Sequence, residues 1–164
     1  VLVAAFRELP DRRLIVVGDG PERSRLEALA GPNVAFAGQQ NDVETARHVA
    51  AARAFILAAE EDFGIAPVEA QAAGTPVIAF GRGGALESIR GQDDRAPTGV
   101  FFDTQTPQVV AAAVRAFEAE AGRITAAACR ENALRFTPER FRSEITRVVD
   151  EAFAARARAS AVAA

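Results

Sequence analysis

The sequence of 164 residues contains no lysine, methionine, tryptophan or tyrosine, and it has one cysteine and one histidine. A chain without lysine cannot form a Schiff base and cannot build the lysine-containing phosphate loop of P-loop nucleotidases. Because Cys129 has no second cysteine to pair with, an internal disulfide is excluded and a reducing compartment is indicated. A metal site made of several histidines is excluded as well, since His48 is the only one.

The charge and the composition of the chain exclude further classes of partner and structure. The net charge is −3, whereas a general nucleic-acid-binding protein is usually basic, so we expect no nucleic-acid partner. Apolar residues make up 49% of the chain, which excludes a disordered tail. No apolar run approaches the ~20 residues of a membrane-spanning helix. Since position 1 is valine and no methionine follows, we expect the chain to be a piece of a longer protein.

Short β-branched runs alternate with helical stretches along the chain. Strands are expected at residues 14–17, 34–37, 54–57, 76–80 and 99–102, with helices between them at residues 21–30, 42–52 and 66–73. The strands are almost continuously apolar, as in parallel sheets covered on both faces. Further helices are expected from Pro107, over residues 124–135 and from Pro138. The sequence predicts one α/β domain over residues 1–164, a doubly wound, Rossmann-like parallel sheet with C-terminal helices and a frayed tail at residues 154–164.

Four segments lie where such a sheet binds ligands, which is beyond the carboxyl ends of its strands. They are residues 18–20, 38–40, 58–65 and 81–84, and each contains glycine. Glycine lets backbone N–H groups approach anionic oxygens closely. A tight turn explains any single glycine equally well, but the clustering favours a phosphate-bearing ligand.

The segment of residues 58–65 is acidic. Glu60, Glu61 and Asp62 follow one another at a strand end, where like charges repel and bring no structural gain. Gly64 then leads into a helix whose first N–H groups form an anion site. Glu69 is expected in the first turn of that helix. There it either stabilises the helix dipole, by about 0.3–1 kcal/mol, or accepts hydrogen bonds from sugar hydroxyls beside a bound phosphate.

Glu61 and Glu69 form an E-x7-E pair inside the sequence EDFGIAPVEAQAAGTPVIAF, which is followed by GGALES. The spacing alone is not informative, because Glu131 and Glu139 have it too. The embedding of the pair, with VGDGPE, NVAFAG and TGVFF in the same order, resembles the C-terminal, donor-binding half of retaining GT-B glycosyltransferases of the family-four type. This resemblance covers nearly all of the chain.

The resemblance implies a retaining hexosyltransferase domain that binds a nucleoside-diphosphate sugar. Glu61 would be its catalytic residue, facing the hydroxyls of the donor sugar. Backbone N–H groups at Phe63, Gly64 and Ile65 would meet the donor sugar and the diphosphate. Glu69 would bind the ribose hydroxyls.

The resemblance also implies where the base lies and which donor is used. The loop near Phe36 and Gly38 would border the base, and Gly18 and Gly20 would line the same cleft. The EDFG sequence is similar to that of mannosyl- and rhamnosyl-type transferases and favours GDP-mannose. No metal or other cofactor is implied, since the chain has no Asp-x-Asp.

The partners implied are the donor, a glycan or lipid-linked acceptor, and an N-terminal half of the same chain that holds this acceptor. The implied location is cytoplasmic, with peripheral association at the inner face of the membrane through that half as an option.

In sheets of this kind the first strand is central, between the strands at residues 14–17 and 54–57. We expect residues 1–9 to form the helix that follows this strand, so that the strand and the phosphate-binding arginine and lysine after it precede the chain. The fragment alone would then be inactive. The alternative is that residues 1–6 are themselves a strand.

Two other functions stay open. A dinucleotide- or flavin-binding domain has a similar architecture, but Glu22 and Glu27 replace the glycine spacing of a G-x-G-x-x-G sequence after the first expected strand. In a non-catalytic interaction domain, the glycosyltransferase motif would persist only as scaffold. Binding of GDP, UDP and NAD separates the three functions.

Overall fold

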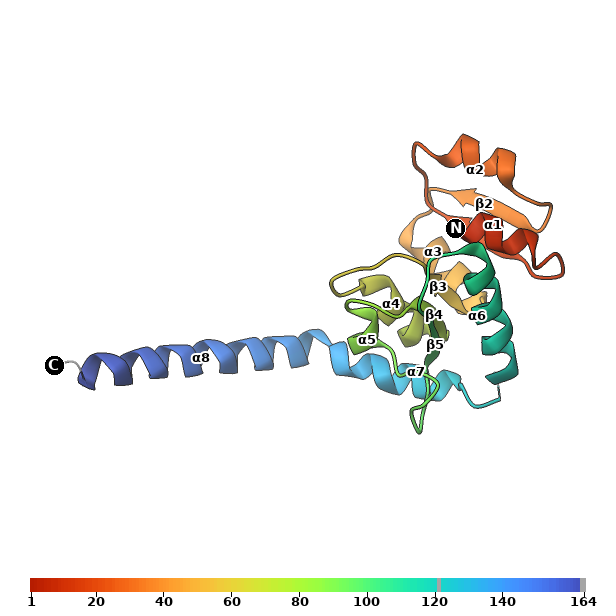
Figure 1. Cartoon of the computed structure of the whole chain (residues 1–164). Coiled ribbons are helices and arrows are strands. Elements are labelled where there is room, and N and C mark those ends of the chain that lie inside the picture. The colour runs from red at the N-terminus through yellow and green to blue at the C-terminus, as the bar shows by residue number, and fades with distance from the viewer. Residues whose placement is uncertain (121, 163–164) are drawn as a thin grey trace. The chain divides into compact units, whose positions relative to one another are not determined.

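The computed structural model describes residues 1–120 and 122–162. The chain divides into two units, Val1–Ala133 and the segment from Leu134 onward, and each is described by itself (Figure 1). The expectation that residues 1–164 form a single domain stays a prediction.

The first unit contains two parallel sheets. Strands β1 (Leu14–Val17) and β2 (Val34–Gly38) form one, and β3 (Phe55–Leu57), β4 (Val77–Phe80) and β5 (Gly99–Phe102) form the other, in the order β3-β4-β5. All five strands begin and end within one residue of the expected bounds. Within the residues described, no ladder of hydrogen bonds joins β1 to β3.

Seven helices surround these strands in the residues described. They are α1 (Leu2–Arg7), α2 (Arg23–Leu29), α3 (Asp42–Ala51), α4 (Ile65–Ala73), α5 (Ala85–Ser88), α6 (Pro107–Glu120) and α7 (Ala126–Ala133). Local signals fix their ends: the Asn41 side chain accepts a hydrogen bond from the Glu44 N–H at the start of α3, and Gly74, with a φ of +91°, ends α4. Helix α5 was not predicted from the sequence, because four residues are too few to show a helical period.

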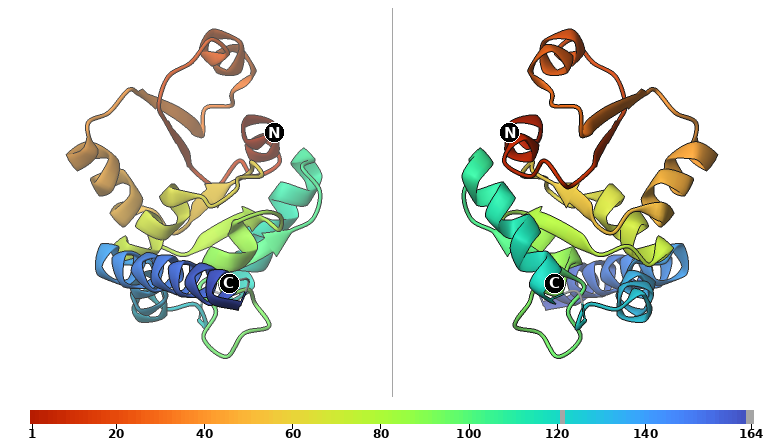
Figure 2. Two further views of the ribbon diagram at one scale, coloured as in Figure 1. Left: turned by 90° about the vertical axis from the view of Figure 1, so that its left-hand side faces the viewer. Right: turned by 90° about the vertical axis from the view of Figure 1, so that its right-hand side faces the viewer.

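The core lies on both faces of the three-stranded sheet. Ile78 and Phe80 of β4 pack on one face with α1 and α6, whereas Val77 and Ala79 pack on the other with α3, α4 and α5. Figure 2 shows α1 beside α6, away from α3 and α4. Alternate side chains of one apolar strand therefore enter two different cores. This arrangement confirms the doubly wound α/β fold.

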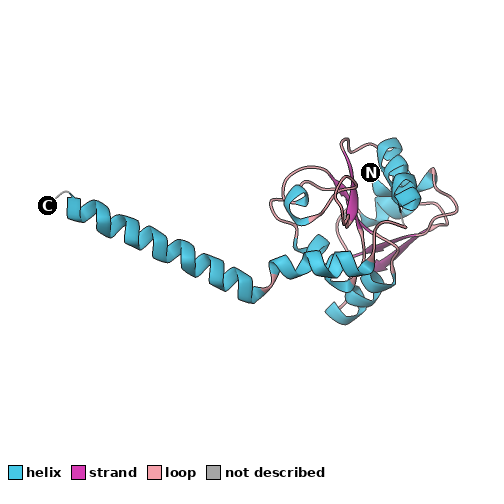
Figure 3. Ribbon diagram, turned by 90° about the horizontal axis from the view of Figure 1, so that it is seen from below, coloured by secondary structure: helices cyan, strands magenta, loops and turns pink. Residues whose placement is uncertain are grey.

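The second unit consists of a 3₁₀ turn, η1 (Leu134–Phe136), and the helix α8 (Pro138–Val162) (Figure 3). The Thr137 hydroxyl accepts a hydrogen bond from the Arg140 N–H at the start of α8. The tail that we expected to fray continues this helix to Val162, and residues 163–164 lie outside the described part; fraying stays a prediction. Among the helices described, none is long and apolar enough to cross a membrane.

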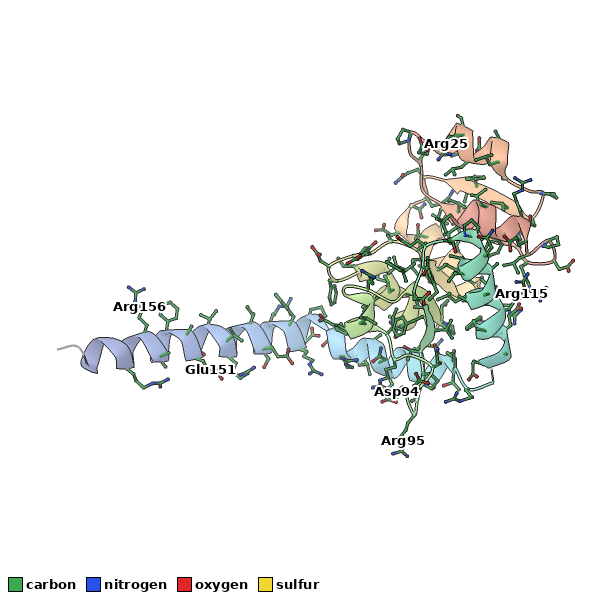
Figure 4. The ribbon with its side chains drawn as sticks, in the orientation of Figure 1. Arg25, Asp94, Arg95, Arg115, Glu151 and Arg156 are labelled. Carbon is green, nitrogen blue, oxygen red and sulfur yellow. The ribbon has the colours of Figure 1, made fainter. Side chains whose placement is uncertain are left out.

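The N-terminal residues connect the two-stranded sheet to α6. Residues 2–7 are helical, so the alternative of a strand at residues 1–6 is wrong. The amide of Asn33 donates to the carbonyls of Phe6, Leu9 and Arg12, which fixes the end of α1 and the turn after it against the start of β2. The Arg115 side chain extends from α6 (Figure 4). It donates to the carbonyl of Glu8 over 3.0 Å. Whether a first strand precedes α1 stays a prediction.

Candidate functional site

Two glycine turns meet at the carboxyl ends of β1 and β2. The Gly18 N–H donates to the carbonyl of Gly38 over 2.8 Å, and both residues have a positive φ. A Cβ atom on Gly38 would lie 2.9 Å from Nη1 of Arg23. Arg23 forms ion pairs with Glu27 (2.8 Å) and Asp19 (3.4 Å), and its hydrogen bond to Glu27 raises the pKa of the guanidinium. The structure thus brings Gly18 and Gly38 together beside a positive charge.

The two other residues expected here are less closely involved. Gly20 lies in the exposed turn before α2, and its N–H donates to Asp19 Oδ1 over 2.8 Å. This N–H group is therefore already occupied. Phe36 is half-buried on β2, where it pairs with Val16 in the parallel register two residues before Gly38.

The acidic loop, residues 58–64, connects β3 to α4. Glu60, Glu61, Asp62 and Phe63 are exposed, whereas Gly64 is buried and has a φ of +79° directly before the helix. A Cβ atom on Gly64 would lie 3.4 Å from Oε2 of Glu61. The Glu61 carboxylate therefore lies beside the N-terminus of α4. Such a terminus attracts anions, because its first N–H groups have no partner within the helix.

Glu69 does not lie in the first turn of α4, as we had expected. The helix begins at Ile65, so Pro67 is its third residue and Glu69 its fifth. A proline is tolerated in the first turn, where its missing N–H costs nothing, and this allows the earlier start. Since the effect of the helix dipole falls off within the first turn, dipole stabilisation explains Glu69 poorly. Glu69 is exposed on α4, one turn beyond Ile65.

The loop between β4 and α5, residues 81–84, lies against the acidic loop. The Gly84 N–H donates to the carbonyl of Glu61 over 2.8 Å. Arg82 is exposed in this loop, and its guanidinium carbon lies 5.7 Å from the centre of the Phe80 ring. The structure therefore joins two of the four expected segments here and the other two at Gly18 and Gly38.

A sequence profile of the family described as "Glycosyl transferases group 1" matches residues 1–136. The chain belongs to this family. The match includes both groups of segments and every residue expected at the site.

Individual proteins that the chain is similar to are glycosyltransferases or related synthases as well. Over 133 residues (79% of the chain) it is 34% identical to the GDP-mannose-dependent alpha-(1-6)-phosphatidylinositol dimannoside mannosyltransferase of Mycobacterium tuberculosis, of which it covers 33%. Over 105 residues (63% of the chain) it is 31% identical to the sulfoquinovosyl transferase of Arabidopsis thaliana, of which it covers 20%. The solved structure of a sucrose-phosphate synthase from Thermosynechococcus elongatus matches with a TM-score of 0.78 and 29% identity, over 94% of this chain and 42% of that one.

The chain thus spans a fifth to a third of the length of these two curated relatives and less than half of the solved structure. The resemblance to the C-terminal domain of GT-B glycosyltransferases is confirmed, and the α/β fold with it.

A buried polar network, which the sequence pattern did not predict, holds α4 in place. Gln71 donates to the carbonyls of Pro67 and Ser88, and Asn132 of α7 donates to Oε1 of Gln71 and to the same Ser88 carbonyl. All three polar residues are fully buried. A signal was present, because Gln71 lies on the face of α4 that Pro67 and Ala70 mark as buried. The network connects the helix that carries Glu69 to α5 and α7.

The single cysteine and the single histidine, which are common metal ligands or nucleophiles in other proteins, lie outside these segments. Cys129 is fully buried on α7, where burial raises the pKa of its thiol to about 11. It acts as a small core residue. His48 is half-buried in the last turn of α3. Among the described residues, no three His, Cys, Asp or Glu side chains form a cluster that could hold a metal ion.

Proposed function

We propose that residues 1–133 bind a nucleoside-diphosphate sugar for retaining transfer of its hexose. The observation that carries the proposal is the Glu61 carboxylate beside Gly64 at the N-terminus of α4, at the carboxyl end of β3. A carboxylate close to an anion site is unfavourable when the ligand is a bare phosphate. It is useful when a sugar with hydroxyl donors follows the phosphate, as in a sugar nucleotide.

The proposed roles follow from these positions. The diphosphate would approach the backbone N–H groups of Phe63, Gly64 and Ile65, where the helix terminus favours negative charge. Glu61 would accept hydrogen bonds from the hexose hydroxyls. Glu69, exposed one turn further along α4, would accept hydrogen bonds from the ribose hydroxyls.

The nucleoside base would lie towards the ends of β1 and β2. Phe36 and Gly38 would border it, and Gly18 and Gly20 would line the same cleft. The Gly20 N–H already has Asp19 as its acceptor, so this residue would contribute shape and not a hydrogen bond.

The departing diphosphate needs stabilisation, because negative charge develops on it as the glycosidic bond breaks. The N-terminus of α4 supplies part of this stabilisation, and Arg82 is an exposed cation in the loop that contacts the acidic loop. We propose that no metal takes part. The acceptor, a glycan or lipid-linked group, would be held by a further domain, and a location in the cytoplasm or at the inner face of the membrane belongs to the same proposal.

GDP-mannose is the donor that we favour. Two kinds of support exist: the EDFG sequence, and the mannosyltransferase relative whose name includes GDP-mannose. Calorimetry of the full-length protein with GDP, UDP and NAD tests the choice. We expect GDP to bind with the highest affinity. Preference for NAD would instead support a dinucleotide-binding domain, and no binding of any of the three would support an interaction domain.

The residue roles are tested in the same protein with Glu69→Ala and Glu61→Ala. Glu69→Ala should weaken GDP binding by about 1–3 kcal/mol, the cost of losing hydrogen bonds to a charged acceptor. Glu61→Ala should lower turnover far more than GDP binding, because Glu61 contacts only the sugar. Glu131→Ala is the matched control, since Glu131 belongs to the second E-x7-E pair and lies on α7, where it pairs with Arg90. Unchanged GDP binding in Glu69→Ala would contradict the ribose role, and equal losses of turnover and binding in Glu61→Ala would make that residue structural.

A further inference from the structure

Gly83 and Gly84, the glycine pair, lie directly against the backbone of the acidic loop. A Cβ atom on Gly83 would lie 2.3 Å from the carbonyl oxygen of Glu61. A Cβ atom on Gly84 would lie 2.4 Å from Cα of Phe63 and 2.5 Å from the carbonyl oxygen of Asp62. These obstructing atoms are all backbone, so no flexible side chain can turn aside. Only glycine at both positions allows the two loops to approach this closely.

The two glycines differ in backbone conformation, so substitutions at them can separate the effect of a steric clash from that of backbone strain. Gly83 has a φ of +58°, a conformation that side-chain-bearing residues rarely adopt. Gly84 has a φ of −62° and a ψ of −15°, which any residue adopts easily. Replacing Gly84 by alanine therefore adds a collision and no backbone strain.

Of the two loops in contact, residues 81–84 are held more firmly by their neighbours than the acidic loop is. Residues 81–84 connect β4, all of whose residues are buried, to α5. The last residue of α5, Ser88, has its carbonyl fixed by Gln71 and Asn132. On the opposite side, Glu60 to Phe63 are exposed. An added methyl group at the pair would consequently displace the acidic loop rather than the loop that carries it.

We propose that Gly83 and Gly84 are positioning residues: they allow the backbone of the acidic loop to lie close to residues 81–84, and so fix its position at the end of β3. The close contact and the hydrogen bond from the Gly84 N–H to the Glu61 carbonyl together fix the backbone from which the Glu61 side chain and the N–H of Phe63 extend. The inference rests on the proposed function for its ligand: the pair controls contact with the hexose and the diphosphate, and leaves contact with the base and ribose unaffected.

The test compares GDP-mannose with GMP, which lacks the hexose and the second phosphate, in the full-length protein. Gly84→Ala is expected to lower the ratio of the two affinities about tenfold, while GMP affinity stays within about threefold of the wild type. A displacement of about 1 Å can lower turnover by about 10²-fold, so kcat should fall as well. A merely structural role would not change the ratio.

Two matched controls add the same methyl group elsewhere. Gly122→Ala places it in open space and should change nothing. Gly99→Ala places it 2.1 Å from the carbonyl oxygen of Val77, inside the sheet and away from the acidic loop. This variant should lower the melting temperature and reduce both affinities equally. If Gly84→Ala does not fold, Gly83→Asn replaces it, because asparagine tolerates a positive φ and still adds a Cβ atom against Glu61.

The inference is overturned if Gly84→Ala keeps the wild-type ratio, or if it lowers both affinities equally as Gly99→Ala does. A wild-type protein that binds neither nucleotide overturns the proposed function instead. Amide hydrogen exchange of residues 60–65 then decides the positioning role by itself. Faster exchange in Gly84→Ala than in Gly122→Ala supports it, and equal exchange in both overturns it.

Discussion

Strands β1 and β4 have similar sequences, LIVV and VIAF, but very different surroundings. In β4, Val77 and Ile78 are 0% and 1% exposed, whereas Ile15 and Val17 of β1 are 39% and 37% exposed. The difference comes from neighbours. β4 has a strand on each side and helices on both faces, whereas β2 is the one strand that pairs with β1 within residues 1–120 and 122–162. An apolar strand sequence thus predicts burial on both faces, and the part of the chain that the structure describes buries β4 on both faces but leaves Ile15 and Val17 of β1 exposed.

The strand edges show the same contrast. Both edges of β4 are used, whereas within the described residues β1 and β3 each have one edge without a strand partner. Such edges expose unpaired N–H and C=O groups and are a liability in a sheet. We expect a further strand between β1 and β3 in the full-length protein, as the apolar composition of β1 indicates. The difference in burial between β1 and β4 can therefore be tested by substitutions in the two strands.

The largest effect is expected from shortening one isoleucine in each region. Ile78→Ala should lower the free energy of unfolding by about 2–5 kcal/mol, because it leaves a cavity in a packed core. Ile15→Ala should cost about 1 kcal/mol or less, since that side chain keeps contact with water. Urea unfolding of the 164-residue chain followed by far-UV circular dichroism measures both, as the chain has no tryptophan or tyrosine to report by fluorescence. Equal losses would show that β1 is as buried as β4 in solution.

The fold was predictable because its signals are local. Apolar β-branched runs predicted all five strands, and Pro107 marked the start of α6. The start of α4 was misplaced because Gly64, in a left-handed conformation, allows the helix to begin two residues before Pro67. The four-residue α5 shows no period at all.

The candidate site was predictable in composition and not in contacts. The E-x7-E sequence named Glu61 and Glu69, but nothing in it showed that the loop of Gly83 and Gly84 lies against Glu61. The polar network of Gln71 and Asn132 was missed for the same reason, since the two residues are 61 positions apart. Contacts between distant segments depend on how the elements pack, which spacing within one segment does not record.

Acid should weaken the attachment of the two-stranded region before it affects β4. Arg12, in the turn before β1, forms two hydrogen bonds with Glu118 of α6, and these bonds lower the pKa of the Glu118 carboxyl. Because the pKa is lower in the folded chain, the stabilisation is present above the ordinary value near 4.5 and is lost as the pH falls through the lowered one. We therefore expect hydrogen-exchange protection of β1 and β2 to decrease at acidic pH more than that of β4.

Glu118→Gln removes the group that titrates, so in this variant the extra loss of protection in β1 and β2 should disappear. Glu144→Gln is the matched control, because the ion pair of Glu144 with Arg140 lies within α8 and joins no strands. If wild type and Glu118→Gln respond to acid in the same way, the Arg12–Glu118 pair does not attach the two-stranded region.

The smallest effect on stability is expected from replacing a serine in the well-packed region, which is the three-stranded sheet and the helices that cover it. Ser88 is fully buried, and its hydroxyl oxygen has no hydrogen-bond partner among the described residues, although its carbonyl accepts two hydrogen bonds. Ser88→Ala removes an unsatisfied polar group and should stabilise the chain by up to about 1 kcal/mol. Ser24→Ala, at an exposed position of α2 beside the two-stranded sheet, should gain only the few tenths of a kcal/mol that follow from helix propensity. Urea midpoints of the two variants give the comparison. A loss of stability in Ser88→Ala would mean that a buried water or another group satisfies the hydroxyl in solution, and that even the well-packed region depends on a partner outside the described residues.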